Sequence, residues 1–233
     1  MVCVRRDDNV SHALELEQGK DFDQFPVLHD DSIVGILFRG DYDRSWSVAD
    51  VMNDAGDGVL VSSTMPIADL IPELQILHAK LILRNARIEG LVTQSDLLKL
   101  PVRILVFGLV NHLELCLRAL IRTRLKESEW LDRLNSAARS RVTKDQRRLR
   151  KQRLEPDPLE FTTFSHLIQI VLAEPDMPDD SKEELERIKA LRDDIAHAKT
   201  FIASPDDVYK FATTFIILQR WIENITLMVE AAS

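Results

Sequence analysis

The chain has 233 residues, 45% of them hydrophobic and 29% charged, which is the composition of an ordinary soluble globular protein. Its formal net charge of −8 excludes a surface that binds nucleic acid throughout, but not a local basic patch. The two cysteines, Cys3 and Cys116, have no CxxC partner, so we expect reduced thiols. The charged N-terminus does not resemble a secretory signal, and the most apolar run, Ile104 to Val110, is too short to span a bilayer. We therefore expect a cytoplasmic protein without a membrane partner.

Glycine content and charge divide the chain near Pro101. Six of the seven glycines precede this residue, and residues 1–100 hold 17 acidic and 9 basic residues, whereas residues 101–233 hold 21 of each. A glycine-punctuated first half before a nearly glycine-free second half predicts an α+β fold, in which a mixed region precedes an all-α region. We assign residues 1–45 and 46–100 to two copies of a repeat and residues 101–233 to a helical domain.

The first hundred residues repeat at an interval of 55. Without a gap, this shift aligns Val4 with Val59, Val27 with Ile82, Gly35 with Gly90, and Asp41 with Asp96. Each copy predicts a short strand, a helix, two apolar strands joined by a polar turn, and a second helix. The turns are expected at residues 29–32 and 84–87.

The duplicated unit resembles a pair of CBS domains. The resemblance rests on the corner that reads Gly90-Leu91-Val92-Thr93-Gln94-Ser95-Asp96, and on Ser47 to Met52, which is similar to the segment that opens a second repeat. It implies a tandem pair of βαββα repeats. It also implies an adenosine nucleotide, such as AMP, ATP or a related compound, as effector.

The Thr93–Asp96 corner has the chemistry of a nucleotide site. Asp96 could accept both ribose hydroxyls, while Thr93 and the free N–H groups of the helix start face phosphate. The same residues could instead only cap the helix. In the first copy Phe38 replaces the threonine, so we favour the second copy if one site binds. The candidate ligand-binding residues are Thr93, Asp96, Ser95, Gln94, Leu83, Asp41 and Arg39.

Helical periodicity dominates the second half. Amphipathic runs predict helices over residues 101–128, 161–172, 181–199 and 208–229. Ser181 and Glu184 predict a capping box at the start of the third helix. The result is a four-helix architecture with a long connection from about Ala137 to Pro158.

The third predicted helix carries one suggestive motif, from Arg192 to His197. It resembles the arginine–polar–three residues–histidine motif of HEPN domains, many of which are metal-independent ribonucleases that act as dimers. The resemblance implies a HEPN-type bundle, a homodimer, and catalytic roles for Arg192, Asp193 and His197. At about 100° per residue, Asp193 and His197 share a face, so Asp193 could orient the imidazole. The alternatives are an exposed, salt-bridged helix end and a non-catalytic dimerisation domain.

Residues 139–153 form a basic segment with eight basic residues and one acid. This predicts attraction to phosphate, although the absence of interleaved aromatic residues argues against base stacking, and a solvated or partner-contacting face fits equally. The candidate RNA-binding residues are Arg147, Arg148, Arg150 and Lys151. The scattered histidines predict no metal site.

Three functional hypotheses follow. The first is a nucleotide-regulated, metal-independent endoribonuclease with a toxin or defence role. The second is a CBS sensor without catalysis, whose helical domain mediates dimerisation or binds a partner protein. The third is a nucleic-acid-binding regulator that acts through residues 139–153.

Overall fold

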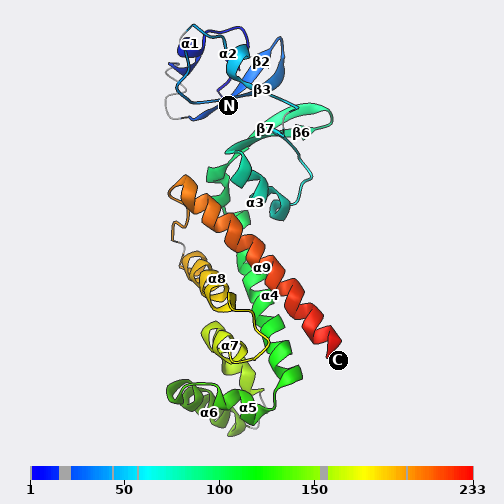
Figure 1. The fold of residues 1–233 in the computed structure, drawn as a ribbon, viewed down its shortest axis with the longest axis vertical. Helices are drawn as coiled ribbons and strands as arrows, with labels where there is room; N and C mark the ends of the chain where they lie inside the picture. Colours follow the sequence, from blue (N-terminus) through cyan, green and yellow to red (C-terminus); the bar gives the residue numbers. More distant parts are fainter. Residues whose placement is uncertain are drawn as a thin grey trace. The chain divides into compact units, whose positions relative to one another are not determined.

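The computed structural model describes residues 2–15, 22–43, 45–56, 58–152, 157–197 and 199–232. The chain divides into two compact units, Met1–Lys99 and Leu100–Ser233 (Figure 1). Unit 1 contains both helices and sheets, whereas the elements described in unit 2 are helices. The mixed α+β fold predicted from the glycine distribution is therefore confirmed.

Unit 1 contains two sheets. The first sheet, with its helices, comprises β1 (Val4–Arg5), α1 (Val10–Leu14), β2 (Gln24–His29), β3 (Ser32–Phe38), α2 (Val48–Val51) and β4 (Asn53–Asp54), with strand order β1-β2-β3-β4; α2 and β4 belong to the predicted second copy. The second comprises β5 (Leu60–Ser62), α3 (Ile67–Ile76), β6 (Ala79–Arg84), β7 (Arg87–Thr93) and the 3-10 helix η2 (Gln94–Leu98), with strand order β5-β6-β7.

The hairpins preserve the 55-residue repeat in detail. β2 pairs antiparallel with β3 and β6 with β7, and the register slips at Val27/Leu28 in one hairpin and at the equivalent Ile82/Leu83 in the other. Both predicted turns are confirmed. Asn85 and Ala86 have φ values of 47° and 60°, so the second turn has the two left-handed residues that suit the twist of a tight hairpin.

The ungapped alignment is wrong for the first strand and helix of each copy. Val27 pairs with Val4, whereas its equivalent Ile82 pairs with Val61 and not with Val59. These parts of the two copies are therefore related by a shift of 57 residues, because Val4 corresponds to Val61. The second copy is two residues shorter between the start of its helix and its hairpin, and a sequence shift without gaps cannot detect this change.

The two copies share a hydrophobic core. Ile36 of β3 is fully buried together with Val59, Ala79 and Leu81 of the second copy. Beside this core lies Lys80, only 3% exposed, whose Nζ donates to the Gly58 carbonyl at 2.6 Å and to Glu73 Oε2 at 2.7 Å. These two acceptors compensate a charge that burial would otherwise penalise heavily.

Gly35 and Gly90 occupy equivalent positions but meet different surroundings. β4 pairs with β3 at Gly35, and a Cβ atom there would lie 2.4 Å from the Asn53 carbonyl oxygen. At Gly90 the nearest atom would be the Ile82 side chain at 3.4 Å. Within the described residues β7 pairs only with β6, because the chain continues after η2 into a helix.

Unit 2 is a set of helices arranged around one long helix. Its elements are α4 (Leu100–Arg124), α5 (Glu127–Asp132), α6 (Ser136–Arg150), η3 (Pro158–Phe161), α7 (Phe164–Val171), α8 (Ser181–Ala196) and α9 (Pro205–Ala231). α4 packs against α7, α8 and α9, and α9 runs beside it in the same direction (Figure 1).

Two predictions for unit 2 are wrong in detail. The expected connection from residue 137 to 158 lies largely within helix α6, because the apolar positions of α6, such as Val142, are buried against neighbouring residues. Ser181 is not the N-cap of α8: Asp180 takes that position, and Ser181 is fully buried. The carboxylate of Glu184 does not complete a capping box, since it accepts from the indole N–H of Trp221 at 2.8 Å and pairs with Arg220.

α4 is longer than the apolar run Ile104–Val110 suggested. By length and composition alone it could cross a membrane: its most apolar stretch has a mean hydropathy of 1.8, and 39% of that stretch is buried inside the protein. A core helix of a soluble protein passes the same test. The continuous run Ile104–Val110 is too short to span a bilayer, but the helix that contains it is not, because helix geometry extends the apolar face beyond that run.

The different surroundings of the two glycines predict different costs of an added methyl group. We expect Gly35→Ala to lower the free energy of unfolding by about 2 kcal/mol or more, because the backbone of β4 must move. Gly90→Ala should change it by no more than about 0.5 kcal/mol, because its site has room. Urea denaturation of both variants measures the difference, and equal losses would contradict the role of β4.

Candidate functional site

The Thr93–Asp96 corner closes the end of β7 and starts η2. The Thr93 backbone N–H donates to Asp96 Oδ2 at 2.7 Å, and Thr93 Oγ1 lies 2.7 Å from Ser95 Oγ. Asp96 also forms an ion pair with Lys99, and this hydrogen bond and charge raise the pKa of Lys99. The structure therefore brings Thr93, Ser95 and Asp96 together, and uses them as a helix cap.

The cap leaves part of Asp96 open to exchange. Its side chain is 22% exposed, while that of its partner Lys99 is 71% exposed. An ion pair with an exposed lysine adds little stability. A ribose hydroxyl could therefore replace Lys99 at Asp96 Oδ1 without breaking the cap that Asp96 Oδ2 makes with the Thr93 N–H. The freed ammonium of Lys99 would then be available to phosphate.

Leu83 does not belong to this corner. Ala79 pairs with Thr93 at one end of the hairpin, whereas Leu83 pairs with Ile88 near the other end. The antiparallel register places Leu83 four residues along β6 from the Thr93 pair, or about 13 Å at the usual rise per residue. Leu83 therefore lies near the opposite end of the hairpin from Thr93, and its role in ligand binding stays a prediction.

Gln94 and Arg39 have equivalent structural roles. Gln94 Nε2 donates to the Leu74 carbonyl of α3 at 2.9 Å, and Arg39 Nη1 donates to the Leu14 carbonyl of α1 at 3.3 Å. Both side chains hold the end of the preceding helix against the hairpin, where helix carbonyls lack partners. In the same copy as Arg39, Asp41 lies exposed in a loop that begins no helix.

The motif residues of α8 do not converge. Arg192 Nη1 donates to Asp193 Oδ1 at 3.0 Å, so the carboxylate pairs with its neighbour and not with the imidazole. His197 is exposed at the C-cap of α8, and only its backbone N–H contacts Asp193, at the carbonyl oxygen. The shared face predicted for Asp193 and His197 does not lead to contact between their side chains, because the Asp193 carboxylate pairs with Arg192 instead.

The basic segment forms an exposed face of α6. Arg147, Arg148, Arg150 and Lys151 are all exposed. Three of them line an open groove of about 1120 Å³, whose other lining residues are polar or charged apart from Leu134. Near this helix, burial and then the charge of Arg141 lower the pKa of His166. The face suits polyanions, but it holds no aromatic platform for bases.

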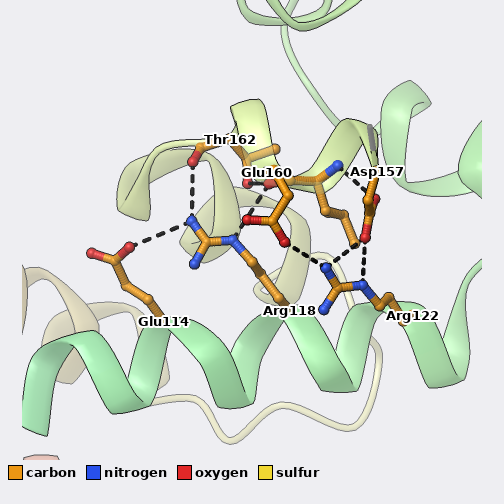
Figure 2. Close-up of polar contacts among 7 residues, drawn as sticks. Glu114, Arg118, Arg122, Asp157, Glu160 and Thr162 are labelled. Atoms are coloured by element: carbon orange, nitrogen blue, oxygen red, sulfur yellow. Dashed lines mark hydrogen bonds and ion pairs between the residues drawn. The ribbon is translucent and has the colours of Figure 1, made fainter. Parts of the chain in front are cut away.

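Sequence reasoning missed a polar cluster that fastens η3 to α4 (Figure 2). Arg118, 11% exposed, lies 3.5 Å from Glu114 and donates to the carbonyls of Leu159 and Thr162 at 3.4 and 3.3 Å. One turn further, Arg122 contacts the carboxylates of Asp157 and Glu160. The spacing of Glu114, Arg118 and Arg122 by four residues could have revealed a charged stripe on α4, but not its distant partners.

Comparison with known proteins supports the first unit. Residues 1–44 match the CBS domain family. Similar solved structures include a hemolysin-like protein containing a CBS domain from Oenococcus oeni PSU, with 22% identity, a TM-score of 0.36, and coverage of 42% of this chain and 78% of that one. CBS domains of a transcriptional regulator from Streptococcus pneumoniae match with 25% identity, a TM-score of 0.35, and coverage of 40% and 83%.

A third similar structure is a signal-transduction protein with CBS domains from Burkholderia ambifaria MC40-6. It has 18% identity and a TM-score of 0.37, and the match covers 42% of this chain and 80% of that one. TM-scores of this size carry no argument of their own, so the CBS assignment rests on the family match at residues 1–44. A comparison with curated proteins found no match. In the described part of the chain, no group of three or more histidine, cysteine, aspartate or glutamate side chains is placed to hold a metal ion.

The polar cluster predicts unequal roles for its two arginines. Arg118→Met should lower the free energy of unfolding by about 2 kcal/mol, because it removes charged donors from a largely buried site. Arg122→Met should cost less than about 1 kcal/mol, because the 43% exposed Arg122 is solvated in either state. Chemical denaturation compares the two, and a larger loss for Arg122→Met would contradict this ranking.

Proposed function

We propose that this protein is a regulatory sensor in which unit 1 binds an adenosine nucleotide, such as AMP or ATP, and unit 2 carries the response. The CBS family match at residues 1–44 is the observation that carries the proposal. The Thr93–Asp96 corner supports it, because it presents two hydroxyls and a carboxylate whose exposed partner can be displaced.

The binding step has a simple physical form. Asp96 keeps its bond to the Thr93 N–H and accepts a ribose hydroxyl in place of Lys99. Thr93 and Ser95 donate to phosphate, and the released Lys99 adds a charge-assisted bond. The first copy binds the nucleotide more weakly or not at all. Asp41 does not lie at the start of a helix, and Arg39 already donates to the Leu14 carbonyl at the end of α1.

The response of unit 2 is an association, with a second copy or with a partner protein. The helices of unit 2 present exposed apolar and charged faces, whereas the α8 motif forms no catalytic cluster within one chain. We expect this to occur in the cytoplasm. A HEPN-like fold of unit 2 stays a hypothesis.

A second candidate function is metal-independent cleavage of RNA, in a toxin or defence role. One observation favours it: α6 presents Arg147, Arg148 and Lys151 to solvent in the same unit as the α8 motif. To contact RNA held at α6 by its phosphates, Arg192 would have to leave its ion pair with Asp193.

Nucleotide binding predicts a site-specific loss of thermal stabilisation. AMP or ATP should raise the melting temperature of the wild-type chain and of Asp41→Ala, but not of Asp96→Ala. Asp96→Asn removes the charge but keeps an oxygen that can accept from the Thr93 N–H, whereas Asp96→Ala removes both. Comparing the two variants separates the effect of the charge from the effect of the helix cap. Each shift is measured against the same variant without nucleotide. Equal shifts in all four proteins would show that the ligand binds elsewhere.

Cleavage of RNA predicts a different pattern. If unit 2 is a ribonuclease, purified protein in EDTA cuts a labelled RNA, and Arg192→Ala and His197→Ala each slow the cut by at least about a hundredfold. Lys189→Ala, which removes a basic residue of α8 that is not part of the motif, serves as the control. RNA that stays intact with and without nucleotide would eliminate this candidate and leave the sensor proposal unaffected.

A further inference from the structure

A groove runs between α8 and the first half of α9. Its volume is about 650 Å³. Leu191 and Phe211 form its floor and are 8% and 3% exposed, while Tyr209 stands on its rim with 61% of its surface exposed. An apolar floor beside an exposed aromatic side chain is typical of a surface that a protein partner covers.

One pair of opposite charges on α8 is placed symmetrically about the middle of the helix. Glu183 pairs with Arg187 near the start of the helix, and Asp194 pairs with Lys199 just beyond its end, at 3.4 Å. Arg187 and Asp194 lie at equal distances from a midpoint between Ala190 and Leu191 and carry opposite charges, and Glu183 and Lys199 lie at nearly equal distances from it. Arg187 and Asp194 are separated by seven residues, about two helical turns or 10 Å, so both lie on one face.

That face is the one beside the groove. Arg187, Ala190, Leu191 and Asp194 all line it, and the side chains of Arg187 and Asp194 are 51% and 38% exposed. The exposed residue at the centre of the face is Ala190, whose small side chain allows a second helix to approach closely.

We propose that the groove is occupied by α8 of a second copy of this chain, in an antiparallel, two-fold arrangement. Arg187 then meets Asp194 of the partner subunit, and Glu183 comes near Lys199 of the partner subunit. The two ion pairs already present in each chain join into rings of alternating charge, one on each side of the axis. In an isologous contact each such interaction occurs twice, which doubles the effect of a single substitution.

This interface is distinct from the α8 motif. Helix geometry places Arg192 about 150° around α8 from the Arg187–Asp194 face, so dimerisation here turns the two Arg192 side chains away from each other. The proposal gives the association of unit 2 a defined surface. It depends on neither nucleotide binding nor RNA cleavage, so its failure is separate from theirs.

Another exposed surface supplies the control. The first half of α4 presents Ile104, Phe107 and Leu115, with exposed fractions of 63%, 42% and 60%. This stripe is apolar but carries no self-complementary charge pattern, so the proposal assigns it no part in the dimer.

The test is a charge swap in the full chain, with oligomeric state measured by light scattering and analytical ultracentrifugation. Arg187→Asp and Asp194→Arg each place like charges together twice, and each should raise the dimer dissociation constant by at least about tenfold. The double variant R187D/D194R should restore the dimer. An equimolar mixture of the two single variants should form a one-to-one heterodimer, because every cross-interface pair is then of opposite charge.

Lys189→Glu, which reverses a charge on another face of α8, is the matched control and should leave the dimer unchanged. Circular dichroism establishes that every variant is folded. A wild-type chain that is monomeric at 100 μM would overturn the proposal. So would single variants that dimerise like the wild type, a mixture that yields no heterodimer, or a dimer that is lost only in Ile104→Glu and Phe107→Glu.

Discussion

Unit 2 depends on the burial of one continuous apolar stripe on α4. Val106, Leu113 and Leu117 are fully buried, and α7, α8 and α9 all pack against this helix. An amphipathic helix cannot bury its own apolar face, so α7, α8 and α9 each depend on packing against α4. The second half of α4 also carries Arg118 and Arg122, whose side chains hold η3.

Polar residues at the candidate sites already take part in local structure. Asp96 caps η2, Gln94 and Arg39 hold helix ends, and Arg192 pairs with Asp193. Ligand binding must therefore exchange one partner for another. The exchange is inexpensive at Asp96, whose partner Lys99 is exposed, and costly at Gln94 or Arg39, where a helix carbonyl would lose its donor.

The two repeats have diverged where the chain leaves them. After β3 the chain returns as β4 and pairs at Gly35, whereas after β7 it continues through η2 into α4. The same aligned glycine is thus required by a close strand in one copy and has space in the other. The second repeat ends in a cap, and that cap is the best candidate for the ligand site.

Much of this architecture follows from local sequence. Period-two and period-3.6 patterns located the hairpins, their turns and the main helices, because these patterns depend on neighbours a few residues away. The capping role of Thr93 and Asp96 was also readable as an alternative, since both partners lie within one turn.

Only the tertiary structure decided which distant groups meet. Pairing across the fold determines three features that local patterns do not show. These are the shift of 57 residues in the first strands, the separation of Leu83 from Thr93, and the partners of Arg118. Asp193 and Glu184 took partners other than those their spacing suggested, because a carboxylate pairs with the nearest available donor in space. The sequence by itself determined the repeat and the helix-forming stretches. The packing of those elements determined which polar side chains remain available for function.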